Sequence, residues 1–194
     1  MVFLMHLGDL SNELGKKLTT YSRQVLKSYI NEHKKLDALT DPAILLEKAG
    51  IFCTLRKFGN LRGCIGYPYP TFALGDALVK ATIQSAVDDP RFPQVTANEL
   101  QDITIELTIL TPPELITVTK FEDYYQKIKL GEDGLIIEHK GQRGLLLPQV
   151  PTEQHWTIDE YLEGICHKAY LSPNSWKNIN DTKLYKFNGK IFEE

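Results

Sequence analysis

Cysteine is scarce in this 194-residue sequence, which contains only Cys53, Cys64 and Cys166. Because the three are odd in number and widely spaced, they do not form a disulfide framework, and a reducing cytoplasm is the expected location. Long apolar runs are also missing, and none approaches the roughly 18 residues of a membrane-spanning helix. The apolar segment 1–7 lacks a basic start and a small-residue cleavage site, so we expect neither a signal peptide nor a membrane anchor.

The sequence has no long block of lysine or arginine, and its formal net charge is −3. General binding to nucleic acid is therefore not expected, because phosphate backbones attract clustered positive charge. Several basic residues do fall on the first predicted helix, namely Lys16, Lys17, Arg23 and Lys27.

Motifs that bind metals or cofactors are absent. The sequence has no Cys-x-x-Cys or His-x-x-x-His pair, no glycine-rich phosphate-binding loop and no serine-hydrolase elbow. Cys166 and His167 are adjacent, but on a helix they would project about 100° apart, which is poor geometry for a shared metal. We therefore expect no metal and no cofactor. His167 is a candidate ligand-binding residue, although an exposed helical pair with Glu163 is the simpler interpretation.

Periodic patterns predict the elements. After Ser11, apolar residues recur at helical spacing and predict an amphipathic helix of about six turns. Further helices are predicted at 44–48, 71–87, 121–128 and 157–170, and strands at 51–57, 61–65, 103–109, 135–138, 144–147, 183–187 and 190–192. Apolar and polar residues alternate along 103–109, and a capping box of Thr157 and Glu160 opens the helix at 157–170. A tight turn at Gly59-Asn60 joins the first two strands. This irregular mixture favours an α+β fold with a mainly antiparallel or mixed sheet. With 42% hydrophobic residues, the chain is long enough for one domain over 1–194, with or without a smaller subdomain.

The segment Leu61–Gly66 carries the strongest indication of chemistry. Side chains alternate along a strand, so we expect Arg62 and Cys64 to share a face, about 7 Å apart. A positive charge beside a thiol lowers its pKa, as does the N-terminus of a following helix, so Cys64 is a candidate nucleophile. Gly63 and Gly66 leave space that a ligand or another backbone fills, so both are candidate ligand contacts. The alternative is a small buried cysteine in a closely packed strand.

Four charged residues each have a functional and a structural interpretation. Arg62 either binds a carboxylate or phosphate, or forms an internal ion pair with Glu106 or Asp89. Glu106 is a candidate general base if its sheet face lines a cleft, although a solvated face is the simpler interpretation. Asp89 and Arg91 either bind a ligand from a proline-stiffened loop or pin that loop as an ion pair.

Six ordered blocks of the sequence resemble the AMMECR family, named after a human chromosomal region linked to Alport syndrome, midface hypoplasia and elliptocytosis. The blocks are Leu61–Gly66, Asp89–Phe92, Ile105–Pro112, Arg143–Pro151, Trp156, and Cys166–Ala169 with Pro173 and Trp176 after it. The resemblance covers about 41–187, which is most of the chain. One residue departs from the family pattern, because Tyr170 stands where the family is expected to have a glycine.

The resemblance implies an α+β fold with a main sheet-containing part and a smaller subdomain. It also implies occurrence in prokaryotes or archaea as a stand-alone protein, with some relatives fused to, or encoded beside, a Memo-family protein and a radical-SAM enzyme. It brings no established reaction, substrate or catalytic residue. Two functions are therefore weighed. One is an enzyme or enzyme component that acts on a small polar or anionic substrate. The other is a binding or adaptor module that uses the glycine-rich strand to dock a protein partner.

Overall fold

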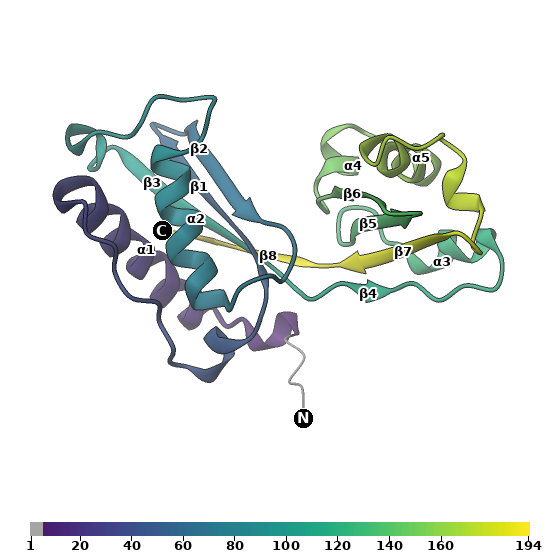
Figure 1. Cartoon of the computed structure of the whole chain (residues 1–194), viewed down its shortest axis with the longest axis horizontal. Helices are drawn as coiled ribbons and strands as arrows, with labels where there is room; N and C mark the ends of the chain where they lie inside the picture. The colour runs from purple at the N-terminus through teal and green to yellow at the C-terminus, as the bar shows by residue number, and fades with distance from the viewer. Residues whose placement is uncertain (1–5) are drawn as a thin grey trace. The chain divides into compact units, whose positions relative to one another are not determined.

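The computed structural model describes residues 6–194, which fold into two compact units. Unit 1 contains the chain up to Pro112 together with Lys190–Glu194, and unit 2 contains Pro113–Gly189. Across the described residues there are five α-helices and two four-stranded antiparallel sheets, so the predicted α+β class is confirmed (Figure 1).

The sheet of unit 1 has the strand order β2-β1-β3-β8. Its strands are β1 (Gly50–Lys57), β2 (Asn60–Tyr67), β3 (Ile103–Leu110) and β8 (Gly189–Glu193). Along β3 the predicted alternation is confirmed, because every second residue from Ile103 to Ile109 is at most 2% exposed. These buried side chains join one core with the apolar faces of the helices α1 (Asn12–Glu32) and α2 (Leu74–Val87). The intervening side chains project from the opposite face of the sheet.

The two helices of unit 1 begin for different reasons. Helix α1 begins after Ser11, as the sequence predicts, and the Ser11 hydroxyl caps it by accepting the Leu14 N–H at 3.1 Å. Helix α2 begins at Leu74 and not at Thr71, so the predicted start is wrong. A bridge between Ala73 and Lys48 holds the chain extended just before the helix, and the Leu74 N–H donates to the Glu47 carbonyl at 2.8 Å. A tertiary contact therefore sets this boundary.

A tight turn joins β1 to β2. Lys57 pairs with Asn60, so the loop is Phe58-Gly59, one residue earlier than the sequence predicts. Both loop residues have positive φ, at 50° and 80°, as a two-residue hairpin turn with the right-handed twist requires. Further along, Leu55 lies opposite Gly63 but Arg56 lies opposite Leu61. A β-bulge therefore leaves Arg62 as the unpaired extra residue of β2.

Unit 2 has a second sheet, of order β4-β7-β5-β6. Its elements are β4 (Glu114–Leu115), α3 (Tyr124–Lys127), β5 (Gly134–His139), β6 (Gln142–Leu146), α4 (Val150–Glu153), α5 (Ile158–Lys168) and β7 (Thr182–Phe187). A separate core forms around the buried side chains of Tyr124, Tyr161 and Trp176. The predicted capping box opens α5, because Thr157 and Glu160 bond each other's backbone N–H groups. The two predicted C-terminal strands exist, but β7 and β8 belong to different sheets.

Candidate functional site

A polar row crosses three strands on the sheet face opposite the core. Cys64 of β2 lies opposite Thr54 of β1, and Thr54 lies opposite Glu106 of β3. The Thr54 hydroxyl donates to the Cys64 Sγ at 3.3 Å. Beyond Thr54, Glu106 accepts two hydrogen bonds from the Arg56 guanidinium, each 3.3 Å long. Two candidates from the sequence, Cys64 and Glu106, therefore share one face.

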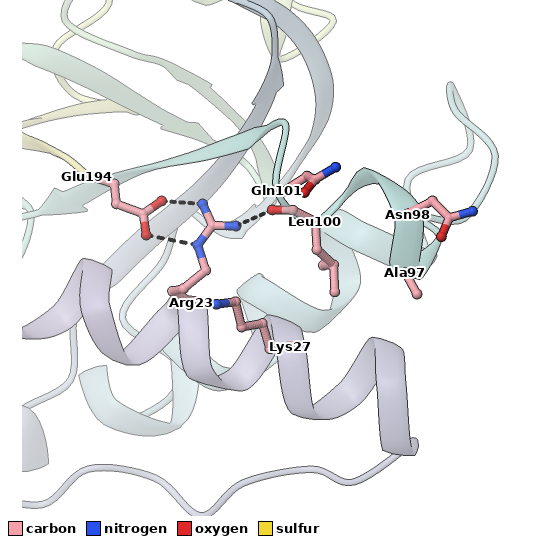
Figure 2. A pocket seen from close by; sticks show the side chains of 7 residues that line it. All are labelled: Arg23, Lys27, Ala97, Asn98, Leu100, Gln101 and Glu194. Carbon is pink, nitrogen blue, oxygen red and sulfur yellow. Dashed lines mark hydrogen bonds and ion pairs between the residues drawn. The ribbon is translucent and has the colours of Figure 1, made fainter.

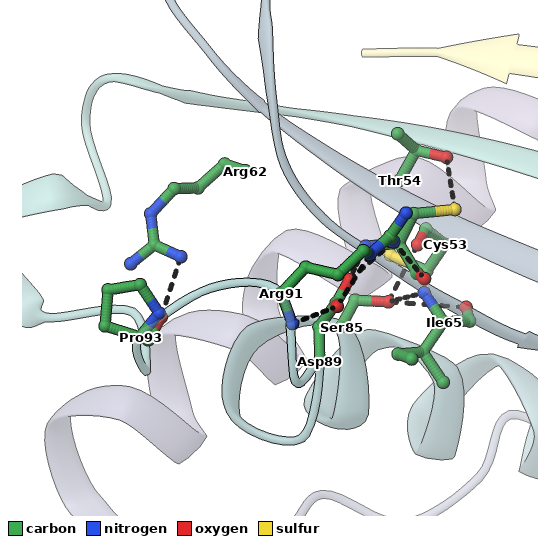
Figure 3. A network of polar contacts seen from close by, with 9 residues as sticks. Cys53, Thr54, Arg62, Ile65, Ser85, Asp89, Arg91 and Pro93 are labelled. Atoms are coloured by element: carbon green, nitrogen blue, oxygen red, sulfur yellow. Dashed lines mark hydrogen bonds and ion pairs between the residues drawn. The ribbon is translucent and has the colours of Figure 1, made fainter.

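Arg62 does not join this row, so the predicted same-face pair with Cys64 is wrong. The bulge at Arg62 interrupts the alternation on which that prediction depends. Its guanidinium donates to both carboxylate oxygens of Glu99, at 3.1 and 3.0 Å, and to the carbonyl of Pro93 at 2.8 Å. Figure 3 shows the Arg62 side chain reaching toward Pro93, away from Thr54. Its acidic partner is thus neither Glu106 nor Asp89.

Glu99 is the centre of this second cluster. It also accepts a hydrogen bond from Lys57 at 3.0 Å and one from the Thr96 N–H at 3.0 Å. The hydrogen bonds from Arg62, followed by those from Thr96 and Lys57, hold the pKa of the Glu99 carboxyl well below its usual range. The spacing Thr96-x-x-Glu99 is a capping-box signal that the sequence already contained. Glu99 and Arg62 are 37 residues apart in the sequence, so no local pattern predicts their contact.

The predicted pair of Asp89 and Arg91 is present and fixes the backbone of Cys64. Asp89 is 4% exposed and accepts the Cys64 N–H at 2.8 Å. Arg91 binds Asp89 through Nε at 2.9 Å and Nη2 at 2.7 Å, and also donates to the Cys64 carbonyl at 3.1 Å (Figure 3). The hydrogen bonds from Arg91 hold the pKa of Asp89 well below its usual range. The arginine that contacts Cys64 is therefore Arg91.

The glycines beside Cys64 accommodate the chain's own backbone. A Cβ at Gly63 would overlap the Ser85 carbonyl oxygen, and one at Gly66 would overlap the Ile51 carbonyl oxygen. At both glycines the space is filled by backbone, which is one of the two alternatives that the sequence left open. Ser85 also accepts the Ile65 N–H at 2.8 Å. Because Ser85 lies in the last turn of α2, the C-terminal part of this helix packs on β2, and the expected helix N-terminus beside Cys64 is also wrong.

The three cysteines differ in burial. Cys53 and Cys166 are fully buried, whereas Cys64 is half-buried. Burial raises the pKa of the Cys53 thiol to about 12 and also raises the pKa of the Cys166 thiol. Cys64 is thus the cysteine with access to solvent.

His167 lies on α5 in unit 2, whereas the other candidate residues belong to unit 1. Its side chain is exposed and lines a shallow hollow with Trp156, Glu163 and Lys168. Over residues 6–194, no group of three histidine, cysteine, aspartate or glutamate side chains is arranged to hold a metal ion. In the same described range, no helix is long and apolar enough to span a membrane.

Comparisons with known proteins agree with this architecture. The sequence model of the AMMECR1 family matches residues 19–192. A protein of Methanocaldococcus jannaschii is 47% identical over 187 residues, covering 95% of this chain and 92% of that one. A protein of Methanothermobacter thermautotrophicus is 44% identical over 191 residues, covering 98% of this chain and 99% of that one.

A solved structure is also similar. The crystal structure of an uncharacterized protein from Pyrococcus horikoshii superposes with a TM-score of 0.81 at 44% sequence identity. The match covers 95% of this chain and 93% of that chain. With a family model that covers most of its length and relatives of this similarity, the chain belongs to the AMMECR1 family.

Proposed function

We propose that the chain is an enzyme, or a component of one, that acts on a small polar or anionic substrate through Cys64. The supporting observation is the strand register that aligns Cys64, Thr54 and Glu106 on one sheet face. Directly opposed side chains in such a row have Cβ atoms about 5 Å apart, close enough for several groups to contact one small molecule. Asp89 and Arg91 support the proposal further, because they fix the Cys64 backbone.

Each member of the row has a chemical role in this proposal. Cys64 supplies the nucleophilic sulfur, since it is the cysteine that is accessible in the folded chain. The Thr54 hydroxyl, which already donates to that sulfur, stabilises negative charge there. Arg56 is 41% exposed, and its hydrogen bonds to Glu106 are long, at 3.3 Å, so its exposed guanidinium also contacts an anionic group of the substrate. Glu106 orients Arg56.

The test combines a metabolite screen with matched variants. Purified protein is incubated with a metabolite pool, and compounds consumed or formed are identified by mass spectrometry. We expect turnover that is lost in Cys64→Ser and reduced in Thr54→Val. It should be unchanged in Lys35→Ala, which alters an exposed residue outside the row. Turnover that survives in Cys64→Ser would show that the thiol is not the reacting group.

A binding module is the second candidate, because the tip of the same hairpin exposes apolar side chains. Phe58 is 74% exposed and Leu61 is 38% exposed. The edge of β2 is already capped at Cys64 by Asp89 and Arg91, so a partner would dock on side chains and not by adding a strand. The partner proposed is the Memo-family protein or radical-SAM enzyme that the family resemblance implies. Co-elution with either purified protein, lost in Phe58→Ser and retained in Lys35→Ala, would favour this function over catalysis.

A further inference from the structure

Unit 1 contains a second polar hollow, separate from the Cys64 row. It has a volume of about 620 Å³ and lies beside α1 (Figure 2). Its polar lining consists of Arg23, Lys27, Asn98, Gln101 and Glu194. The Cys64, Thr54 and Glu106 side chains do not line it, so it does not depend on the function proposed above.

The guanidinium of Arg23 is held rigidly at the wall of this hollow. It is only 16% exposed. Its Nη1 donates to the Leu100 carbonyl at 2.8 Å, and its Nη2 donates to the Ile103 carbonyl. The remaining edge, formed by Nε and Nη2, faces Glu194 and binds both oxygens of that carboxylate, as Figure 2 shows. Arg23 is therefore preorganised for bidentate recognition of a carboxylate.

Glu194 occupies this edge of Arg23 from within the chain. Its backbone N–H donates to the Ile105 carbonyl at 3.1 Å, so the main chain is held independently of the side chain. The side chain is 29% exposed and can rotate into solvent without moving that backbone bond. An external carboxylate would then form the same two hydrogen bonds with Arg23. One charge-assisted pair would replace another, and the external ligand must compete with the tethered Glu194 carboxylate for Arg23.

A second positive charge lies one helical turn along. Lys27 follows Arg23 by four residues on α1, so their Cβ atoms are about 6 Å apart. The Lys27 side chain is exposed, and the amides of Asn98 and Gln101 belong to the same lining. When Glu194 rotates away, two cations and two amides line the hollow. We propose that this hollow binds a small dicarboxylate, with one carboxylate on Arg23 in place of Glu194 and the other on Lys27.

The experiment titrates the full chain with glutarate by isothermal calorimetry, with acetate as the monocarboxylate control. Wild type should bind glutarate at one saturable site and acetate much more weakly. Glu194→Gln should bind glutarate about tenfold more tightly, because a neutral amide competes less well for Arg23. Lys27→Ala should bind about tenfold more weakly, whereas Lys35→Ala, an equal charge change away from the hollow, should behave as wild type.

Three results would overturn the proposal. The first is the absence of saturable glutarate binding in both wild type and Glu194→Gln, with thermal melting showing that both proteins are folded. The second is an equal loss of affinity in Lys27→Ala and Lys35→Ala, which would indicate non-specific charge attraction. The third is acetate binding as tight as glutarate binding, which would exclude a site for two carboxylates.

Discussion

The carboxylate of Asp89 accepts the backbone N–H of Cys64 at 2.8 Å, across 25 residues of sequence. We expect Asp89→Asn to lower the free energy of unfolding by about 2 kcal/mol, because the ion pair with Arg91 is lost and the Cys64 N–H has a weaker acceptor. Chemical denaturation at neutral pH measures this. Asp88→Asn, in the exposed neighbouring residue, is the matched control and should change stability little.

The contribution of Asp89 should depend on pH. Pairing with Arg91 lowers the pKa of Asp89 in the folded protein, so the unfolded chain binds this proton more readily. The stabilisation is complete above the unfolded pKa of about 4 and is lost as the pH falls below it, toward the folded pKa. The stability difference between wild type and Asp89→Asn should therefore shrink on acidification from pH 5. A difference that stayed constant down to the acid unfolding transition would contradict the assigned ion pair.

Cysteine labelling should single out Cys64. Brief treatment of the native protein with iodoacetamide is expected to modify Cys64 and to leave Cys53 and Cys166 unmodified. The latter two are fully buried, and burial raises the pKa of both thiols. Peptide mass spectrometry measures the modified fraction of each cysteine, and the same reaction in denaturant should label all three. Native labelling of Cys53 at the rate of Cys64 would mean that β1 opens.

Replacement of Gly63 should be costly because α2 packs directly on its backbone. In Gly63→Ala, the new methyl group would overlap the Ser85 carbonyl oxygen, and backbone on both sides would have to shift. We expect a loss of about 2–3 kcal/mol or more, measured by denaturant unfolding. Gly8→Ala is the control, because a Cβ there meets no atom within 4 Å. Equal stability of the two variants would rule out the close contact.

Tyr170 is a site for stabilisation. It follows the end of α5 with φ of 58°, and its N–H donates to the His167 carbonyl while the Leu171 N–H donates to the Cys166 carbonyl. This is a Schellman motif, whose left-handed residue is usually glycine. Tyr170→Gly should raise the free energy of unfolding by about 0.5–1 kcal/mol, because glycine adopts this conformation without strain. Thermal melting measures the gain.

The control for Tyr170→Gly is Tyr170→Ala. Tyr170 is 92% exposed, so removal of its ring alone should change stability little. Alanine keeps the strained left-handed backbone. If only glycine raises the free energy of unfolding, the gain comes from relief of the strain at positive φ. If alanine stabilised the protein as much as glycine, the exposed ring and not the backbone would be responsible.

Local sequence patterns were sufficient where near neighbours decide the structure. The alternation in β3, the start of α1 near Ser11 and the capping box of Thr157 with Glu160 each depend on residues close in sequence, and all three are confirmed. The family could also be recognised from the sequence, because its ordered blocks are short linear motifs of the chain. A local pattern could not place the last two strands in different sheets, since that requires a partner far away in sequence.

The sequence by itself determined the α+β class and the family, and it singled out the segment around Cys64 as a candidate site. Only the tertiary structure decided which side chains surround that cysteine. Arg62 is the extra residue of the β-bulge in β2, and its side chain therefore binds Glu99. Long-range contacts bring Thr54, Asp89 and Arg91 to Cys64 instead. The physical reason is that strand alternation fixes faces only while the ladder is regular, and a bulge depends on how two strands pair.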